Sequence, residues 1–412
     1  MPSIESVRQV PPSGAAASHA AKLVLFLTVF FDLLGFGIVI PFLPLYAQRL
    51  GVGAVGIGLV LSIYSLMQLI FAPMLGALSD RVGRRPIILI GLIGSSVGYL
   101  IYGFAASFAV LLIARAIHGM FAATISTAQA YIADTTDETN RARGMGMIGA
   151  AFGLGFVLGP AIGGLLGRTS LSAPVFFACA LTFANFIFAV IVLPESRSPA
   201  GDAPPFALRN LFGAPAVLRD FANGRLTRLF TIAFLQTLAL AGLEATFAMM
   251  VPRVYGYSAL GVGLLLAYAG LMQAVAQGFL IGRLTRKAGE RAVLAVGLVV
   301  LAIGLIPLGS LHSHFVLFAA LAMVSLGYGL GSPAIASLIT LDAQRGHEGG
   351  ALGLNQSALS LARIVGPIVG GLLYQLFDPA APYIGGAIIV GLALILVRGL
   401  SIAPGASRPV RG

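Results

Sequence analysis

The chain is poor in charge. Of its 412 residues only 9% are charged, whereas 58% are hydrophobic. An average soluble domain carries about 25% charged residues. A soluble protein with so few charges could not cover its surface with polar groups. This composition excludes a soluble enzyme, a nucleic-acid-binding domain and a disordered scaffold.

Cysteine, tryptophan and nucleotide-binding motifs are also scarce or missing. The single cysteine, Cys179, lies in an apolar run, which excludes an intramolecular disulfide and a cysteine-based metal cluster. With no tryptophan, tyrosines must serve any aromatic belt. No G-x-x-x-x-G-K-S/T loop occurs, which excludes ATP as the energy source. We expect no cofactor, no metal and no catalytic residue, with the proton as the coupling ion.

Long apolar runs predict an all-α integral membrane protein, because they are too long for the strands of a membrane barrel. Twelve transmembrane helices are expected, in two six-helix bundles. Their approximate ranges are 22–46, 54–77, 86–106, 108–132, 144–167, 172–193, 227–251, 259–282, 292–310, 314–340, 350–376 and 380–401.

The remaining segments divide the chain into five parts. Residues 1–21 do not read as a signal peptide, because the first apolar run opens at Leu23 and is too long for one. The expected parts are a disordered cytoplasmic N-terminus (1–21), an N-terminal bundle (22–193), a cytoplasmic linker (194–226), a C-terminal bundle (227–401) and a cytoplasmic tail (402–412).

Basic residues are distributed unevenly between the two sides of these spans. Of the 25 lysines and arginines, twenty fall on the side of the N-terminus, three on the other side and two inside spans. Lysine and arginine collect on the cytoplasmic side of membrane proteins. We therefore attribute the net charge of +11 to membrane topology rather than to nucleic-acid binding, and expect both termini in the cytoplasm.

Two motifs recur at nearly the same spacing. Residues 159–166 (GPAIGGLL) recur as 366–373 (GPIVGGLL), 207 positions later, and residues 76–83 match 282–289, 206 positions later. Chance similarity between glycine-rich apolar helices is the alternative. The common spacing, close to half of the chain, favours a duplicated six-helix unit, which is typical of secondary transporters with a substrate site between the halves.

Several motifs resemble those of one transporter family. Residues 76–86 (GALSDRVGRRP) resemble the signature after span 2 of the major facilitator superfamily, and residues 155–164 (GFVLGPAIGG) resemble its antiporter motif. Supporting motifs are DLLGFG (32–37), PFLP (41–44), RAIHG (115–119), YIAD (131–134) and LPES (193–196). Together they resemble the twelve-helix drug:proton antiporters, most closely the tetracycline-efflux group.

The resemblance implies the major facilitator fold in a bacterial inner (plasma) membrane, and alternating access around a cavity lined by spans 1, 2, 4, 5, 7, 8, 10 and 11. We expect a monomer whose partners are a small molecule and the lipid bilayer. The antiporter helix motif comprises Gly155, Gly159, Pro160, Gly163 and Gly164. The tetracycline-efflux group carries an aspartate in span 3, but residues 94–100 here (GSSVGYL) contain no acid. A tetracycline–metal chelate is therefore not the expected substrate.

Four ionisable residues are expected inside spans: Asp32, Arg115, Glu244 and Arg363. Charges at this depth are costly and usually work in a water-filled cavity. Asp32 lies about 15 Å deep, ten residues after Lys22, and is our candidate proton carrier. The alternative is a static ion pair with Arg115. Arginine cannot release a proton, but His118, three residues later, is either a relay or a neutral hydrogen-bonded side chain.

Glu244 is the candidate substrate-binding acid of the second half, about 12 Å from the end of span 7. The alternative is a structural ion pair with Arg363. Aromatic faces of Tyr64 or Phe247 are expected to receive a lipophilic cation beside it. Uncharged polar residues mark further cavity faces, unless they only join helices by hydrogen bonds. They are Gln68, Gln129, Gln236, Gln273, Gln277, Asn355 and Gln356, with Gln273 and Gln277 predicted to share one face.

A gate is predicted at the cytoplasmic end of span 2. The carboxylate of Asp80 is expected to meet the N-terminus of span 11 and to lock the outward-facing state. The surrounding motif and charge network comprise Gly76, Arg81, Gly83, Arg84, Arg85, Asp134, Glu138 and Arg141. The alternative is a solvated basic loop, which explains the arginines but not the acid. The second copy of the motif has Arg286 at the position of Asp80.

These features favour a proton-driven exporter of small amphipathic or cationic drugs. Export or uptake of a metabolite, such as a sugar or an amino-acid derivative, is the first alternative. It would favour a denser polar lining than the one predicted. A non-transporting membrane receptor is the alternative from another class, but no soluble domain longer than about 30 residues accompanies the spans.

Overall fold

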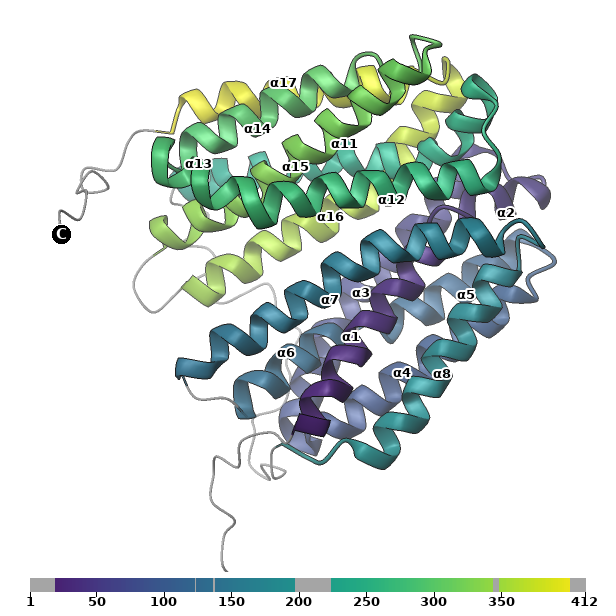
Figure 1. The fold of residues 1–412 in the computed structure, drawn as a ribbon, viewed down its shortest axis with the longest axis vertical. Coiled ribbons are helices and arrows are strands. Elements are labelled where there is room, and N and C mark those ends of the chain that lie inside the picture. The colour runs from purple at the N-terminus through teal and green to yellow at the C-terminus, as the bar shows by residue number, and fades with distance from the viewer. Residues whose placement is uncertain (1–18, 123, 136–137, 197–223, 344–347, 401–412) are drawn as a thin grey trace, which may run out of the picture.

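The chain folds into two helical bundles that lie side by side (Figure 1). The computed structural model describes residues 19–122, 124–135, 138–196, 224–343 and 348–400. The N-terminal bundle consists of α1 (His19–Val39), α2 (Leu43–Arg49), α3 (Ala54–Val82), α4 (Arg84–Gly103), α5 (Phe108–Met120), α6 (Thr124–Thr135), α7 (Glu138–Leu166) and α8 (Ala173–Val192). The C-terminal bundle consists of α11 (Gly224–Tyr255), α12 (Ala259–Val275), the π-helical η1 (Ala276–Leu280), α13 (Ile281–Ala288), α14 (Glu290–Leu305), α15 (His314–Asp342), α16 (Glu348–Leu376) and α17 (Ala381–Arg398).

The helices coincide with the twelve predicted spans. Within the described residues, eight helical stretches are long and apolar enough to cross a membrane, and the bent pair α1–α2 makes a ninth. The other three predicted spans correspond to α5 with α6, to α7 and to α14. The predicted termini and linker lie largely outside the described residues.

Three spans are interrupted where a continuous helix was predicted. Helices α1 and α2 meet at 43° around Pro41, because proline lacks the N–H that would continue the helix. The predicted span 108–132 is divided between α5 and α6. The predicted span 259–282 contains η1, whose π turn changes the direction in which the following side chains point.

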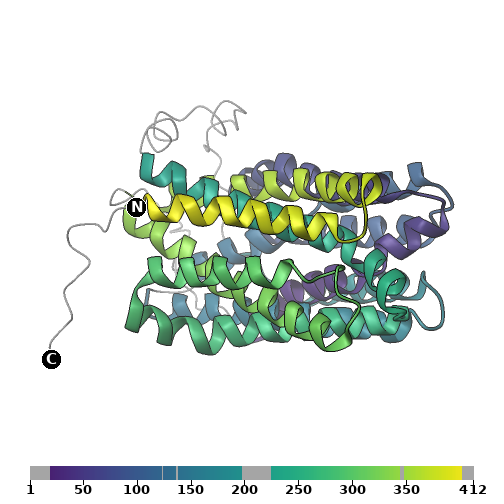
Figure 2. The same cartoon turned by 90° about the horizontal axis from the view of Figure 1, so that it is seen from above.

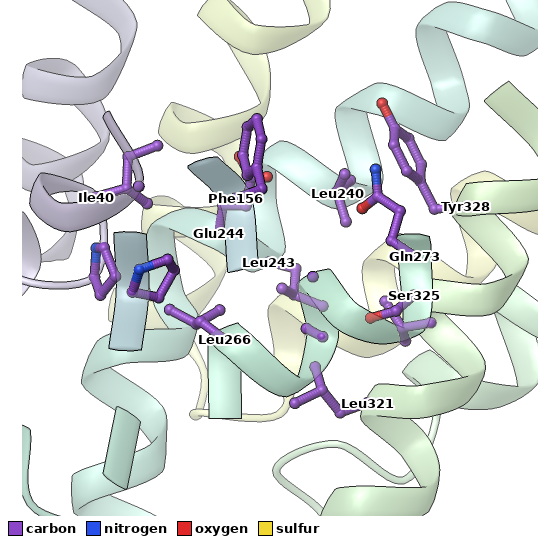
Figure 3. Close-up of a pocket in the computed structure, with 16 residues that line it drawn as sticks. Ile40, Phe156, Leu240, Leu243, Glu244, Leu266, Gln273, Leu321, Ser325 and Tyr328 are labelled. Atoms are coloured by element: carbon purple, nitrogen blue, oxygen red, sulfur yellow. The ribbon is translucent and has the colours of Figure 1, made fainter. Parts of the chain in front are cut away.

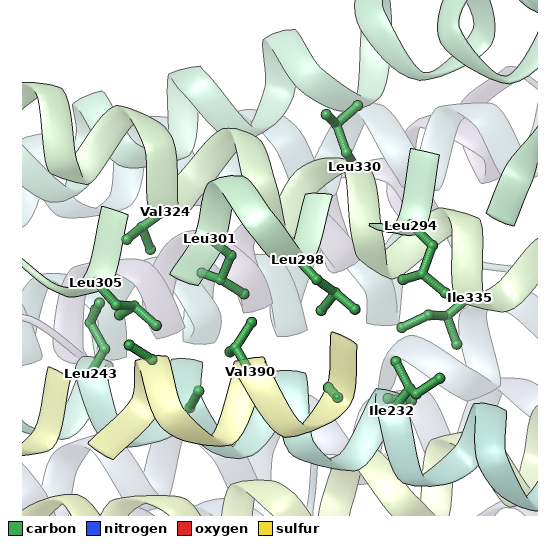
Figure 4. Packing of buried hydrophobic residues seen from close by; sticks show 14 of the residues in the cluster. Ile232, Leu243, Leu294, Leu298, Leu301, Leu305, Val324, Leu330, Ile335 and Val390 are labelled. Atoms are coloured by element: carbon green, nitrogen blue, oxygen red, sulfur yellow. The ribbon is translucent and has the colours of Figure 1, made fainter. Parts of the chain in front are cut away.

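Each bundle has its own apolar core. In the C-terminal bundle, Leu294, Leu298, Leu301 and Leu305 follow one face of α14 and pack against α11, α15 and α17 (Figure 4). Their spacing of three and four residues keeps them on one side of the helix. In a bilayer such packing stabilises the bundle by van der Waals contact rather than by exclusion of water.

The internal repeat has a structural counterpart. Helix α3 continues through Asp80 to Val82, and only Gly83, with a φ of +101°, separates it from α4. In the second half, Gly289 has a φ of +79° and separates α13 from α14 in the same way. A left-handed backbone at this position favours glycine. Most of the motif predicted as a loop is therefore helical, and Asp80 lies in the last turn of α3.

The two bundles contact each other along two seams, α3 with α16 and α7 with α12. The helices of both bundles run nearly parallel (Figures 1 and 2), so the molecule has two ends. We call the end where α8 finishes and α11 begins the linker end, and the opposite one the far end. At the far end, Gly58 of α3 and Gly263 of α12 lie so close to the partner helix that a Cβ atom would collide with the carbonyl oxygens of Pro367 and Pro160, respectively.

The seams separate toward the linker end. A Cβ atom at Gly76 of α3, Gly282 of α13 or Gly353 of α16 would have no neighbour within 4 Å. Two hydrogen bonds join α3 to α16 nearer the far end. Ser62 Oγ donates to the carbonyl of Ile364 (2.5 Å), and the N–H of Val55 donates to Gln375 Oε1 (3.4 Å). Among the described residues, the two bundles are therefore in close contact at the far end and lie farther apart at the linker end (Figure 1).

Candidate functional site

A cavity lies between the two bundles and is lined mainly by apolar side chains (Figure 3). It is bordered by α1 and α7 of the N-terminal bundle and by α11, α12 and α15 of the C-terminal bundle. The lining residues are Gly37, Ile40, Pro41, Phe156, Pro160, Leu240, Leu243, Glu244, Leu266, Ala269, Gly270, Gln273, Leu321, Val324, Ser325 and Tyr328. The predicted candidates Glu244 and Gln273 are both part of this wall.

Glu244 is the only acid among the residues that line the cavity. Arg363 of α16 is close enough for its positive charge to act on Glu244, but no ion pair joins the two in the described part of the chain. The predicted structural tie to Arg363 is therefore not a direct contact in this state. Half-buried and without an ion-pair partner, the carboxyl group of Glu244 is accessible to a ligand.

A second group of polar residues is buried inside the N-terminal bundle, away from the cavity wall. Asp32 of α1, Tyr64 of α3, Tyr99 of α4 and the α5 residues Arg115 and His118 are each less than a tenth exposed. None of the five lines the cavity. We call these residues the buried cluster.

Arg115 is held by aromatic and imidazole groups rather than by an acid. Its guanidinium carbon lies 4.4 Å from the centre of the Tyr64 ring, a cation–π geometry. Its Nη1 lies 3.3 Å from His118 Nδ1. Arginine can only donate, so Nδ1 must accept and the imidazole is neutral in this arrangement. The contact matches the neutral, hydrogen-bonded interpretation of His118.

Asp32 is the acid of the buried cluster and has no direct partner among the described residues. Its charge acts on Tyr64 and Tyr99, but within the described residues it forms no ion pair with Arg115. The static Asp32–Arg115 pair, our alternative from the sequence, is absent from this state. The hydroxyl of Tyr99 also has no hydrogen-bond partner. Unpaired buried polar groups of this kind are typical of sites where a proton or water binds.

The predicted gate residues form a charge network within the N-terminal bundle. Arg84, which is buried, donates to Asp80 (2.7 Å), Asp134 (2.9 Å) and Ser79 Oγ (2.6 Å). Glu195 accepts the backbone N–H groups of Arg84 (2.8 Å) and Arg85 (3.2 Å). These contacts join α3, α4, α6 and the segment after α8, all within the N-terminal half.

The other gate residues are placed less fully. Arg85 donates to the carbonyl of Val190 (2.7 Å), and Arg81 lies half-buried on α3. The side chains of Glu138 and Arg141 lie outside the described residues.

The antiporter helix motif lies on α7, between α1 and α12. Gly155, Gly159 and Gly163 contact α1, whereas Gly164 and Pro160 contact α12 across the seam. Its copy in α16 divides the same two roles between contacts to α11 and contacts to α3. The motif therefore builds both the interior of each half and the seam between halves.

Several predicted polar residues lie away from the cavity. Gln68 donates to the carbonyl of Ala122 (3.3 Å), the helix-joining role that was our alternative. Gln236 and Asn355 line a small second cavity in the C-terminal bundle. Gln277 is exposed, because it lies in η1, and so does not share a face with Gln273. Phe247 is fully buried in the C-terminal core and is not available to a ligand.

Two predicted residues are placed without a decisive contact. Gln129 is half-buried in α6, and Gln356 is exposed on α16.

Sequence reasoning missed five residues. Phe156, Tyr328 and Ser325 line the cavity, Tyr99 belongs to the buried cluster, and Glu195 accepts hydrogen bonds at the start of α4. Glu195 lies in the LPES motif, and Tyr328 lies within a glycine-rich run, GYGLG (327–331), which are usable signals. Phe156 lies in the antiporter motif 155–164, but nothing in that motif distinguishes it from the other apolar residues of a chain that is 58% hydrophobic.

Comparison with known proteins identifies the family. The model of the Major Facilitator Superfamily matches residues 25–276 and 229–410, which together cover most of the chain. The chain belongs to this superfamily. It is therefore a membrane transporter and not an enzyme, and the resemblance read from its motifs is confirmed.

Its relatives include antibiotic and multidrug efflux proteins. It is 34% identical over 388 residues to the class C tetracycline resistance protein of Escherichia coli, covering 92% of this chain and 96% of that protein. It is 28% identical over 380 residues to multidrug resistance protein 1 of Bacillus subtilis, covering 90% and 94%, respectively. The solved structure of the human organic anion transporter MFSD10 (TETRAN) matches with a TM-score of 0.69 at 28% identity, over 94% of this chain and 100% of that one.

Proposed function

We propose that this transporter is a proton-coupled antiporter that exports small lipophilic cations. The observation that carries the proposal is Glu244, one acid in an otherwise uncharged cavity between the two bundles. A carboxylate there attracts a positive charge. Phe156, Tyr328 and the surrounding leucines supply contact area for an apolar body. A sugar would need a denser set of hydrogen-bonding groups than Gln273, Ser325 and Tyr328 provide.

The coupling proton is assigned to Asp32. A carboxyl group at mid-membrane without a direct partner can bind and release a proton, which Arg115 cannot do. The lack of an Asp32–Arg115 ion pair supports this assignment, because a permanent pair would hold the carboxylate in its charged form. Exchange of one proton for one monovalent cation would leave the net charge within the membrane-spanning part of the protein unchanged.

The direction of opening fits export. If the basic linker end lies in the cytoplasm, as the positive-inside rule predicts, the described state is open to the cytoplasm, where a drug would enter. Both termini would then be cytoplasmic, and the protein would lie in the bacterial inner membrane. Closure of the linker end and opening of the far end would release the drug outside.

Tetracycline is not the proposed substrate, although several relatives are named for resistance to it. A magnesium–tetracycline chelate requires an acid in the half of the cavity that binds it. Helix α4 carries none between residues 87 and 103, and Asp32 is assigned to the proton.

Resistance in a drug-sensitive bacterial host tests the substrate class. Cells that express the protein should resist tetraphenylphosphonium and ethidium, and the Glu244→Gln substitution should remove this resistance. Strong tetracycline resistance without cation resistance would overturn the assignment. Uptake of the same cations into inverted vesicles with an imposed pH gradient, abolished by a protonophore, tests the coupling.

A further inference from the structure

The buried cluster and the cavity are separate sites, yet an antiporter must make each site sensitive to the other. Coupling means that a ligand at one site changes the affinity at the second by a defined factor, and that the reverse change is equal. Because none of the buried cluster residues lines the cavity, a cation bound near Glu244 does not touch Asp32. Some group between the two sites has to carry the effect.

A row of aromatic rings spans this gap. The ring of Tyr64 lies 5.1 Å from that of His118 and 5.7 Å from that of Phe36. The ring of Phe36 lies 6.1 Å from that of Phe156, nearly edge-on at 71°. Phe156 lines the cavity, and Tyr64 carries the guanidinium of Arg115 on its face. Phe36 is therefore the link between a cluster residue and a cavity residue.

Phe36 lies between the proton site on α1 and the seam that α7 forms with α12. Phe36 is on α1, one turn after Asp32, so a shift of its ring acts on the helix that carries the proton site. Phe156 is on α7, at the seam with α12, where a Cβ atom at Gly270 would lie 2.9 Å from the Phe156 carbonyl oxygen. Rearrangement of this seam, or a ligand in the cavity, displaces Phe156 first.

We propose that Phe36 couples drug binding to the protonation of Asp32. This rests on the proposed proton-coupled function. A cation in the cavity packs against Phe156, Phe36 follows, and Tyr64 changes its position over Arg115. The charges of Asp32 and Arg115 both act on Tyr64, so the electrostatic surroundings of Asp32 then change with cavity occupancy. Phe36 is half-buried, and its ring contacts both Phe156 and Tyr64, so these two ring contacts carry the displacement.

The groups that act on Asp32 come from several helices. The charge of Asp32 acts on Tyr64 from α3 and Tyr99 from α4, and the rings of these two residues contact Arg115 and His118 from α5. Of the other helices packed against α1, α8 adds Cys179, and α6 adds Tyr131 and Asp134. Helix α7 has titratable residues only in its first two turns (Glu138, Arg141 and Arg143), and their side chains lie outside the described part of the chain. Among the described side chains, Arg115 is the one cation in this set, and its position depends on Tyr64.

The affinity for a lipophilic cation at acidic and at alkaline pH tests this coupling. Tetraphenylphosphonium binding is measured with the purified full-length protein. The dissociation constant at acidic pH divided by that at alkaline pH is the coupling factor, which is typically 5-fold or more between linked sites. Phe36→Leu, which removes the ring but keeps an apolar side chain, should lower this ratio by about 5-fold, toward one. Phe36→Tyr keeps the ring and should retain the wild-type ratio.

Phe31→Leu is the matched control. It is the same substitution on the same helix, and the Phe31 ring contacts Phe30 rather than a cavity residue. It should leave the ratio unchanged. A purely structural role for Phe36 would weaken binding equally at both pH values and likewise leave the ratio unchanged.

Each outcome decides between the two ideas. A wild-type ratio of one would contradict the proton coupling itself. A wild-type ratio well above one that Phe36→Leu retains would overturn the role of Phe36 and leave the proposed function intact. If Phe36→Leu does not fold, Phe156→Leu tests the link from the cavity side. If Phe156→Leu has the same ratio of dissociation constants as the wild type, the proposal is equally overturned.

Discussion

The two halves of this transporter share a fold and an internal repeat but place their embedded charges in different surroundings. In the N-terminal half, Asp32 and Arg115 are buried among aromatic side chains and do not reach the cavity. In the C-terminal half, Glu244 lies on the cavity wall, with Arg363 acting on it from α16. We propose that the duplicated scaffold holds two different sites, a proton site at Asp32 and a drug site at Glu244.

The seams between the halves show the opposite tendency. The α3–α16 and α7–α12 contacts are near copies of each other, with a proline carbonyl against a glycine in each. Rocking of the two halves requires seams that open and close together, whereas proton and drug sites need not resemble each other. The two halves therefore resemble each other at the seams and differ around Asp32 and Glu244.

The largest expected effect comes from removing the acid of the N-terminal half. Asp32→Asn cannot release a proton, so efflux driven by a pH gradient should fall to the level of vesicles without the protein. Asp378→Asn is the matched control. The Asp378 carboxylate accepts the N–H groups of Ala380 and Ala381 near the start of α17, and an asparagine oxygen can do the same. Undiminished drug-driven proton movement in Asp32→Asn would remove the proposed difference between the halves.

The next effect concerns the acid of the C-terminal half. Glu244→Gln keeps the shape of the side chain but removes its charge, so the affinity for a monovalent cation should fall by roughly 10-fold or more. The affinity for an uncharged drug of similar size should change little, and comparison of the two by equilibrium binding isolates the charge. Equal losses for both drugs would show that Glu244 acts through packing instead.

The seam at the far end offers a smaller, conformational effect. Gly58→Ala introduces a methyl group against the Pro367 carbonyl oxygen, and overpacking of this kind costs roughly 1–3 kcal/mol. The population should shift away from the described state. Double electron–electron resonance between spin labels on the far ends of α3 and α16 would show longer distances. Gly76→Ala, on the same helix but with open space around it, should leave the distribution as in the wild type.

The smallest effect is expected at the linker end. Asp80 is 47% exposed in this open state and pairs with Arg84, which retains Asp134 when Asp80 is removed. We propose that Asp80 contacts the N-terminus of α16 when the linker end closes, a helix-end contact that stabilises by about 0.3–1 kcal/mol. Asp80→Ala should therefore reduce the closed population and leave drug binding intact. Unchanged distances between the linker ends of α3 and α16 would contradict the gate.

Much of the fold could be read from the sequence because its signals are long or repeated. Twelve apolar runs, two motifs at one offset and four embedded charges are visible without coordinates, and Glu244 does line the cavity. The interruptions were less predictable. The π turn at η1 (Ala276–Leu280) leaves Gln277 exposed, although its spacing from Gln273 predicts a shared face.

The contacts of the charged side chains inside the spans could not be predicted from the sequence, because they depend on how the helices are packed in the described state. Asp32 and Arg115 have opposite charges in the same bundle, yet in the described state Arg115 lies over Tyr64 instead. Phe247 is aromatic and one turn from Glu244, but it faces the core. Sequence spacing gives the helix on which a residue lies, whereas the side that it faces follows from contacts with helices far away in the chain.

The division of tasks between the halves is tested most directly by counting protons released when a drug binds. In weakly buffered detergent solution, saturating tetraphenylphosphonium should release protons from the wild type. Glu244→Gln should need more drug but release the same amount at saturation, whereas Asp32→Asn should bind the drug and release none. Release that persists in Asp32→Asn and disappears in Glu244→Gln would contradict this account and assign the proton to Glu244.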